Sequence, residues 1–407
     1  MNPEIKKVTV DIGGRPLTIE TGWLAKQASG AVVVRQNDSS VLVTFVRSPG
    51  ARPFDFLPLT VDYQDRTAAE GKIPGGFLKR EGRPGERETL NCRLIDRPIR
   101  PQFPKHLRDE LQIIATSLSF DPASDTDVLA LCGASASIAV SSTPVDKTIA
   151  GVRVVRVGGE FILNPSRDEL AAADIALVVA GTDEAICMVE GGALEAKEAD
   201  MLEAMDLAHE AIRKIIVAIE ELREMVGTVK DVLAPAPVMD EAIYEKVAAA
   251  GLDKLIVALA VREKHARSAA LRAARNEVIA GLSEGLDADE AAAFVKAGKG
   301  AWAKLLRNHM RKTVTEKGIR LDGRATDEVR DIVCEVGVAE RGHGSAVFTR
   351  GETQAFVSAT IGIEEDAQRI DYAGAIEKFR RWMLQYNFPP FSTGEARPMR
   401  GPKRREI

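Results

Sequence analysis

The chain has 407 residues, of which 45% are hydrophobic and 28% are charged, and its formal net charge is −5. This length accommodates two or three domains, and the acidic balance excludes a general attraction to nucleic acid, so any such binding must be local. Four widely spaced cysteines without a CxxC pair fit a reducing compartment and exclude a disulfide framework or zinc ribbon. With no apolar run of membrane-spanning length and no signal-peptide core, the sequence predicts a cytoplasmic protein without membrane association.

The first 63 residues have the pattern of a β-sheet. Short segments rich in β-branched residues predict strands, and the turn sequence Asn37–Ser40 predicts a hairpin. The predicted strands are Val8–Ile12, Leu17–Glu20, Ala31–Gln36, Val41–Val46 and Leu57–Tyr63.

A basic stretch, Gly75–Pro101, stands out against the acidic chain. Glycine and proline break its first half into a loop, with Phe77 and Leu78 at the tip beside Lys79 and Arg80. Cations beside an aromatic ring suit single-stranded nucleic acid, because the charges bind phosphates and the ring stacks on a base. A solvated basic loop has the same composition, so composition alone leaves both interpretations open.

The second half of this stretch predicts a helix over Glu86–Arg97, ended by the prolines that follow. Leu90, Leu94 and Ile95 are expected to face inward, with the arginines on the other side at helical spacing. The residues of the stretch that we expect to bind single-stranded nucleic acid are Phe77, Lys79, Arg80, Arg83, Arg93, Arg97 and Arg100.

Downstream, strands and helices follow in an irregular order, which indicates an α+β fold. The helix predicted over Asp127–Ser141 is rich in small residues, which indicates close packing on a sheet. A long amphipathic helix over Lys197–Val226 ends at Gly227. The strands expected in this region are Leu111–Phe120, Gly151–Val157, Glu160–Leu163 and Ile175–Ala180.

Residues 239–312 predict a helical region beyond a boundary marked by Pro235 and Pro237. Carboxylates and histidines there lack metal-ligand spacing, so a helical linker domain is favoured over a catalytic one. The expected helices, punctuated by glycines, are Met239–Ala250, Leu252–Ile279 with a break near Val261, and Asp287–Val314.

The strand pattern then returns, and with it an internal repeat. Gly30–Thr44 aligns without gaps on Gly344–Ser358, and Glu20–Gly22 matches Glu335–Gly337 upstream. The common order of these matches indicates a duplicated domain with a helical insert. The second copy stops at Ile407, where the first begins its arginine-bearing helix, so we expect it to be incomplete.

Two such copies around a helical region resemble the bacterial polynucleotide phosphorylase family over essentially the whole chain. The resemblance implies an α+β fold with duplicated RNase PH-like domains (ribosomal-protein-S5-domain-2-like) separated by an all-helical domain. It implies boundaries at residues 1–232, 238–314 and 318–407. The segments that carry it are Phe56–Pro84, Cys92–Pro101, Ala176–Thr182, Arg320–Arg324, Arg341–Ala355, Leu384–Glu395 and Gly401–Ile407.

The resemblance implies polyribonucleotide nucleotidyltransferase activity: single-stranded RNA, including mRNA, is degraded from its 3′ end by inorganic phosphate, releasing nucleoside diphosphates. It also implies Mg²⁺, a homotrimer with RNA in a central channel, RNA-degradosome components as partners and no binding of DNA. Family members usually carry two adjacent aromatics at the loop tip. This chain has Phe77 and Leu78 there, which should weaken stacking.

The family's catalytic and metal-binding residues are expected beyond Ile407, so none is predicted within this chain. Lys403, Arg404 and Arg405 match the family's basic segment at the active-site rim and are expected to contact substrate phosphate. A solvated basic loop is the alternative interpretation of these three residues.

The first copy is expected to be degenerate. Asp125 and Asp127 lie where the family's phosphate-binding serine loop would be, and they are predicted to cap the following helix and repel an anion. The leading hypothesis is therefore the RNA-binding half of a phosphorolytic enzyme. The alternatives are a catalytically inactive RNase PH-fold scaffold that binds RNA, and a helical interaction module carried on β domains.

Overall fold

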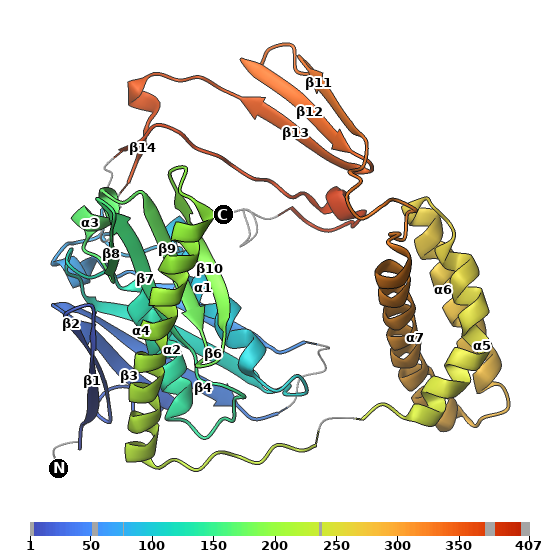
Figure 1. The fold of residues 1–407 in the computed structure, drawn as a ribbon, viewed down its shortest axis with the longest axis horizontal. Helices are drawn as coiled ribbons and strands as arrows, with labels where there is room; N and C mark the ends of the chain where they lie inside the picture. The colour runs from blue at the N-terminus through green and yellow to red at the C-terminus, as the bar shows by residue number, and fades with distance from the viewer. Residues whose placement is uncertain (1–3, 51–55, 76, 236–237, 371–378, 400–407) are drawn as a thin grey trace. The chain divides into compact units, whose positions relative to one another are not determined.

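The computed structural model describes residues 4–50, 56–75, 77–235, 238–370 and 379–399, and Figure 1 traces the chain. The chain divides into two compact units, one of residues 1–235 with 363–407 and the other of residues 236–362. None of the helices within the described ranges is long and apolar enough to cross a membrane.

A six-stranded sheet with the order β1-β2-β3-β4-β6-β5 forms the base of the first unit. Neighbouring strands are antiparallel, except that β5 and β6 are parallel. The strands predicted for this region are confirmed, and no end differs from its predicted position by more than two residues. They are β1 (Lys6–Ile12), β2 (Arg15–Thr21), β3 (Gly30–Gln36), β4 (Ser39–Ser48), β5 (Leu59–Gln64) and β6 (Glu110–Ser119).

A second, antiparallel sheet has the order β10-β9-β7-β8. Three of its strands were predicted, whereas β10 and the short helix α3 (Arg167–Ala171) were not. Within β10 only Met188 is buried, so its sequence lacks the alternation that signals a strand. The strands are β7 (Ala150–Val157), β8 (Glu160–Leu163), β9 (Ile175–Gly181) and β10 (Ile186–Ala193).

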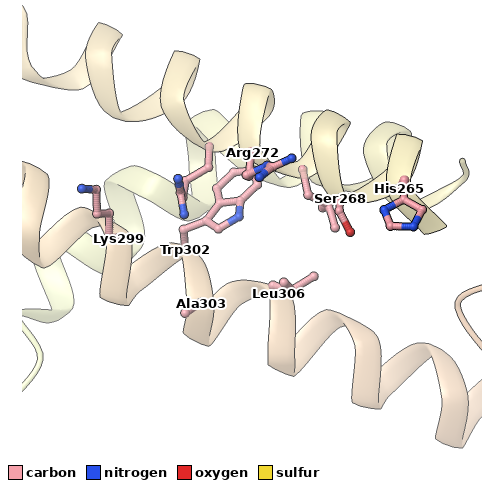
Figure 2. A pocket seen from close by; sticks show the side chains of 9 residues that line it. His265, Ser268, Arg272, Lys299, Trp302, Ala303 and Leu306 are labelled. Atoms are coloured by element: carbon pink, nitrogen blue, oxygen red, sulfur yellow. The ribbon is translucent and has the colours of Figure 1, made fainter. Parts of the chain in front are cut away.

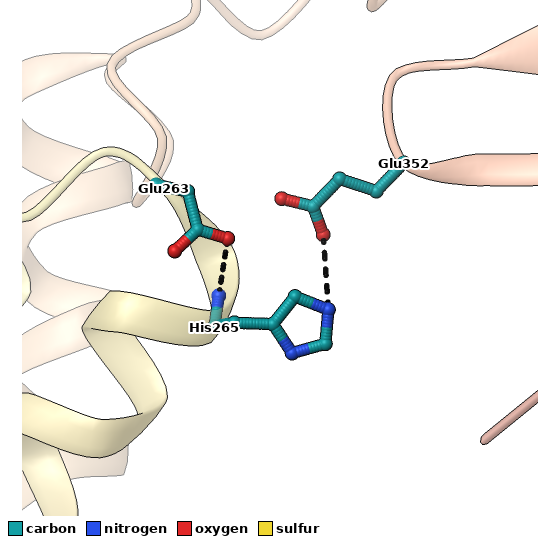
Figure 3. Close-up of side chains that lie close together, drawn as sticks. All are labelled: Glu263, His265 and Glu352. Atoms are coloured by element: carbon teal, nitrogen blue, oxygen red, sulfur yellow. Dashed lines mark hydrogen bonds and ion pairs between the residues drawn. The ribbon is translucent and has the colours of Figure 1, made fainter. Parts of the chain in front are cut away.

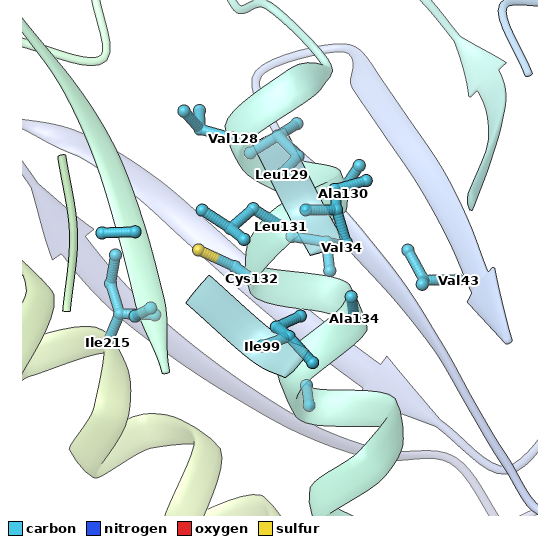
Figure 4. Packing of buried hydrophobic residues seen from close by; sticks show 14 of the residues in the cluster. Val34, Val43, Ile99, Val128, Leu129, Ala130, Leu131, Cys132, Ala134 and Ile215 are labelled. Atoms are coloured by element: carbon cyan, nitrogen blue, oxygen red, sulfur yellow. The ribbon is translucent and has the colours of Figure 1, made fainter. Parts of the chain in front are cut away.

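Helix α2 (Asp127–Ala139) lies between the two sheets, and every one of its residues is buried. Figure 4 shows Val34 and Val43, from β3 and β4, on one side of α2 and Ile215 of helix α4 (Glu198–Val226) on the other. The predicted close packing is confirmed at Gly133, where an added Cβ would lie 2.5 Å from Cγ2 of Val43. The small side chains of α2 thus allow helix and sheet to approach closely.

Helix α1 (Glu86–Ile99) corrects two expectations. It continues through Pro98 instead of ending before it, and the buried side chains of Pro98 and Ile99 offset the hydrogen bond that a proline cannot donate. Leu90 was expected to face inward but is 40% exposed, whereas Leu94 and Ile95 are buried. The buried face of α1 carries Cys92, Leu94, Ile95, Pro98 and Ile99, and Leu90 lies outside it.

The second unit contains a bundle of three helices, α5 (Glu241–Leu259), α6 (Lys264–Ser283) and α7 (Ala288–Lys317). The predicted break near Val261 is confirmed, since α5 ends at Leu259. The predicted helix boundary at Gly251 is wrong, because Gly251 lies inside α5 against the ring of Trp302. An added Cβ at Gly251 would lie 2.8 Å from Cζ3 of that ring, so this glycine serves helix packing.

The internal repeat is confirmed by strand register. In the first copy, β3 and β4 pair Gly30 with Phe45 and Gln36 with Ser39. In the second copy, the corresponding strands pair Gly344 with Ala359 and Arg350 with Thr353, at the same offset along the alignment. The sheet of the second copy consists of β11 (Ile332–Val336), β12 (Gly344–Arg350) and β13 (Thr353–Ala359), in the order β11-β12-β13.

Candidate nucleic-acid interface

The loop between β5 and α1 presents its tip to solvent. The side chain of Phe77 is 99% exposed and that of Leu78 is 82% exposed. Lys79, the next residue, has a positive φ of 50°, and Lys79 and Arg80 are also exposed. A fully exposed ring next to two cations is available to stack on a base, as single-strand binding requires.

Four cations of this surface, Lys79, Arg80, Arg83 and Arg93, are exposed and form no ion pair with any residue that the structure describes. Most arginines elsewhere in the first unit do have a carboxylate partner, for example Arg15 with Glu169 at 2.8 Å. Unpaired cations can bind phosphate without first breaking an intramolecular ion pair, which favours these four as the centre of the interface.

The other two arginines predicted to bind RNA, Arg97 of α1 and Arg100 at its C-cap, each form an ion pair with a carboxylate. Nη1 of Arg97 lies 2.5 Å from a carboxylate oxygen of Glu190, and both side chains are about half exposed. Such a surface pair contributes little to stability and can exchange for phosphate.

Arg100 differs from Arg97, because its donors are committed inside the fold. It donates to the carbonyl oxygens of Leu57 and Leu59 at 3.0 and 2.9 Å and to Asp96 at 2.7 Å. This pattern gives Arg100 a structural task, since it joins α1 to the start of β5.

The start of α2 in the first copy is filled by ion pairs. Asp125 pairs with Arg87, and Asp127 pairs with Arg153. The predicted capping is corrected in detail: Thr126 is the N-cap residue. Besides its arginine, each aspartate accepts one backbone N–H within the described residues, that of the residue that follows it, at 2.8 Å for Thr126 and 2.7 Å for Val128. The exclusion of a phosphate that we expect here would therefore arise from largely buried aspartate–arginine pairs.

A second carboxylate, Asp65, shares the guanidinium of Arg87, with an Oδ2–Nη1 distance of 3.3 Å. The hydroxyl of Tyr63 donates to Asp65 at 3.1 Å and lies 2.7 Å from the hydroxyl of Thr126. Sequence reasoning missed these residues. The signal was the two-residue spacing of Tyr63 and Asp65, which places both on one face of an extended strand.

The two carboxylates on Arg87 titrate differently. Burial raises the pKa of the Asp65 carboxyl from 3.8 to about 6, against the opposing effect of Arg87. Asp125 is only partly exposed as well, but the nearby guanidiniums of Arg87 and Arg153 hold its pKa below the usual value. The guanidinium of Arg87 therefore pairs with two carboxyls of different pKa, and Asp65 is the one that takes up a proton first as the pH falls.

Replacing Asp65 by asparagine should change the pH dependence of stability. Because folding raises the pKa of Asp65, its protonated carboxyl stabilises the folded state fully below about pH 4. This stabilisation is lost as the pH rises through about 6. Between these limits the free energy of unfolding of the native chain should fall by up to about 3 kcal/mol relative to Asp65→Asn. Urea unfolding from about pH 4 to about pH 7 measures this.

Asp168→Asn, at an exposed aspartate of α3, is the matched control for this titration. Parallel pH profiles for Asp65→Asn and the native chain would show that the Asp65 charge is not buried in solution.

One further group of potential ligands lies in the second unit, where Figure 3 shows Glu263, His265 and Glu352. Their ligand atoms lie within 4.8 Å of one another, and all three residues are exposed. Glu263 is the N-cap of α6 and accepts the N–H of His265 at 2.7 Å, while the imidazole lies 3.9 Å from Glu352. A helix cap and a surface pair account for this group.

The other predicted phosphate ligands, Lys403, Arg404 and Arg405, lie outside the described residues. Their expected contact with substrate phosphate stays a prediction.

One known protein family matches both copies of the repeated domain. The profile of the 3′ exoribonuclease family, domain 1, matches residues 13–144 and again residues 328–407. The chain belongs to the 3′ exoribonuclease family. Domain 2 of the same family matches residues 147–211, and the profile of the polyribonucleotide nucleotidyltransferase RNA binding domain matches residues 242–325. The helical region is therefore the insert between two RNase PH segments, as the repeat predicted.

The chain is also similar to curated proteins named polyribonucleotide nucleotidyltransferase. It is 46% identical over 407 residues to the protein of Bacillus subtilis strain 168, covering 100% of this chain and 57% of that protein. It is 47% identical over 403 residues to that of Geotalea daltonii, covering 98% of this chain and 57% of that protein. The chain thus spans 57% of the length of these relatives.

Proposed function

We propose that this chain is the RNA-binding part of a polyribonucleotide nucleotidyltransferase, which degrades single-stranded RNA from the 3′ end with inorganic phosphate and releases nucleoside diphosphates. The observation that carries this proposal is the exposed loop, where Phe77 stands beside Lys79 and Arg80 and neither cation has an intramolecular ion pair among the described residues. Backbone phosphates and one stacked base would be bound there without reading sequence.

Six of the seven predicted RNA ligands fit this role: Phe77, Lys79, Arg80, Arg83, Arg93 and Arg97. Arg100 is assigned to positioning α1, because its guanidinium already donates to Leu57, Leu59 and Asp96. Lys403, Arg404 and Arg405 are proposed to contact the substrate phosphate.

The catalytic step is proposed to lie outside the first copy. A phosphate would need free N–H groups at the start of α2, but the paired side chains of Asp125 and Asp127 occupy that place. Phosphorolysis also needs a divalent cation near the developing charge. Glu263, His265 and Glu352 do not fit Mg²⁺, which prefers an octahedral set of oxygen ligands, because one ligand is an imidazole and another carboxylate is used as a helix cap.

The remaining properties proposed for the whole enzyme rest on the family resemblance described in the sequence analysis. They are Mg²⁺ and inorganic phosphate as cofactor and co-substrate, assembly as a homotrimer, RNA-degradosome components as partners, a cytoplasmic location and domains at residues 1–232, 238–314 and 318–407.

A catalytically inactive RNase PH-fold scaffold that binds RNA is the second candidate. The ion-paired start of α2 favours it, since that observation argues against turnover by the first copy. Both candidates predict the same RNA-binding loop, and only turnover separates them.

Release of nucleoside diphosphate from single-stranded RNA, with phosphate and Mg²⁺, tests the proposal. We expect the 407-residue chain to bind RNA in a salt-sensitive way without release, and a chain extended to the length of the relatives to release nucleoside diphosphates. Release by the 407-residue chain would instead make the first copy catalytic, and no release by either chain would favour the scaffold.

A further inference from the structure

A pocket of about 460 Å³ opens between α6 and α7 in the helical bundle. Its volume is within the range of small-molecule sites in proteins. Figure 2 shows the indole of Trp302 on α7 directed toward α6, with His265 at one end of the pocket and Lys299 at the other. Trp302 is buried, and together with Leu271 and Leu306 it makes the floor apolar.

The charged groups that line this pocket all have the same sign. Arg272 and Arg275 come from α6 and Lys299 from α7, and no aspartate or glutamate is among the described residues of the lining. Arg272 and Lys299 are exposed, whereas Arg275 is half-buried. An apolar floor below a ring of cations suits a ligand with a flat apolar part and a phosphate, which is the chemistry of a nucleotide.

These three cations also lack acidic partners, as far as the described part of the chain shows. The structure gives Arg275 hydrogen bonds to Asn276 only, at 3.1 and 3.3 Å, and gives Arg272 and Lys299 no ion pair. Other lysines of the same bundle are paired: Lys254 with Glu277 at 2.7 Å and Lys304 with Glu241 at 3.3 Å. Mutual repulsion of unpaired cations would be relieved by a bound anion.

The charge of the two helices supports an anionic ligand. Together α6 and α7 carry eleven lysines and arginines against four aspartates and glutamates, in a chain whose net charge is −5. The positive potential is therefore concentrated on the helices that form the pocket, and this potential attracts anions locally despite the acidic chain.

We propose that the pocket between α6 and α7 binds one nucleotide unit, with its base on the apolar floor of Trp302 and its phosphates on Arg272, Arg275 and Lys299. The unit is either a free nucleoside diphosphate or one residue of an RNA chain, since both present the same base and phosphate groups. The pocket lies within residues 242–325, which the RNA binding domain profile matches, and the proposal assigns binding to specific side chains.

The test measures binding of ADP and of a short oligoadenylate to the 407-residue chain, in buffer without Mg²⁺ and phosphate. The oligoadenylate is titrated into the Lys79→Ala, Arg80→Ala, Arg83→Ala background, so that the loop does not mask the pocket. In the double variant Arg272→Ala, Lys299→Ala, we expect the affinity for at least one probe to fall about tenfold or more. Loss for ADP alone identifies a free nucleotide as the ligand, and loss for the oligoadenylate identifies RNA.

Two further variants separate this site from general electrostatics. Arg311→Ala, Lys312→Ala removes the same charge from exposed positions on α7 outside the pocket and should leave both affinities within about twofold. Ala303→Phe fills the pocket without removing charge and should weaken binding. Unchanged affinity for both probes in the Arg272→Ala, Lys299→Ala variant, or an equal loss in the control pair, would overturn the proposal.

Because these titrations contain no phosphate, their outcome does not depend on phosphorolysis. Failure of the pocket proposal and failure of the proposed enzymatic function are therefore separate results.

Discussion

Replacing Lys79, Arg80 and Arg83 together with alanine is expected to weaken binding of single-stranded RNA by roughly one to two orders of magnitude at low salt. All three side chains are exposed and form no ion pair within the described residues, so their charge is available to phosphates. For single strands the slope of log affinity against log salt is about −0.7 per phosphate contact, so the slope should become shallower by about 2.

Fluorescence anisotropy of a labelled oligonucleotide, titrated at several salt concentrations, measures both quantities. A triple variant of exposed lysines elsewhere in the first unit, Lys26→Ala, Lys105→Ala, Lys214→Ala, removes the same charge and should keep most of the affinity. An unchanged salt slope in the loop variant would remove the loop from the interface.

Replacing Arg87 with alanine is expected to lower the free energy of unfolding by about 3–5 kcal/mol. The guanidinium of Arg87 is largely buried and pairs with both Asp65 and Asp125. Without it, two carboxylates would remain close together at the start of α2, and among the described residues Arg153 and Arg167 would still offset part of the charge of Asp125. Equilibrium urea unfolding at neutral pH provides the measurement.

Arg83→Ala is the matched control for Arg87→Ala, because both arginines belong to the basic stretch but Arg83 is exposed and unpaired among the described residues. Its effect on stability should stay within about 0.5 kcal/mol. Adding Asp125→Asn to Arg87→Ala should restore part of the loss. A loss below about 1 kcal/mol in Arg87→Ala would mean that water, and not Arg87, solvates the aspartates.

The sequence predicted most of the first sheet because strand hairpins depend on near neighbours. The alternation of β-branched residues and the turn at Asn37 determine the β3–β4 hairpin, and the repeat predicted a second hairpin that the structure shows in the same register. Strand β10 was not predicted because only Met188 within it is buried, so its sequence lacks a strand pattern. It forms a strand by pairing with β9.

Glycine was the least reliable signal. Gly227 ends α4 with a positive φ of 70°, as predicted. Gly251 also resembled a helix end, but it lies inside α5 because the ring of Trp302 leaves no room for a side chain there. The local sequence is compatible with both uses, and only the packing partner distinguishes them.

The candidate nucleic-acid interface also combines features that the sequence predicted with features that depend on packing. The local sequence was enough to predict that the arginines and lysines between residues 75 and 101 are concentrated in a loop and a helix, because glycine, proline and helical spacing act locally. It also determined the duplicated hairpins and the helical insert. Which of these cations lack a carboxylate partner among the described residues became clear from the packed fold alone.

Arg87 meets Asp125 across 38 positions of the chain, and Arg97 meets Glu190 across 93. Arg80 and Arg83 meet no carboxylate within the described residues. An ion pair depends on distance in space, and residues that far apart in sequence come together only when the sheets and α2 have packed. The same composition therefore yields a buried structural arginine at position 87 and exposed cations for RNA at positions 80 and 83.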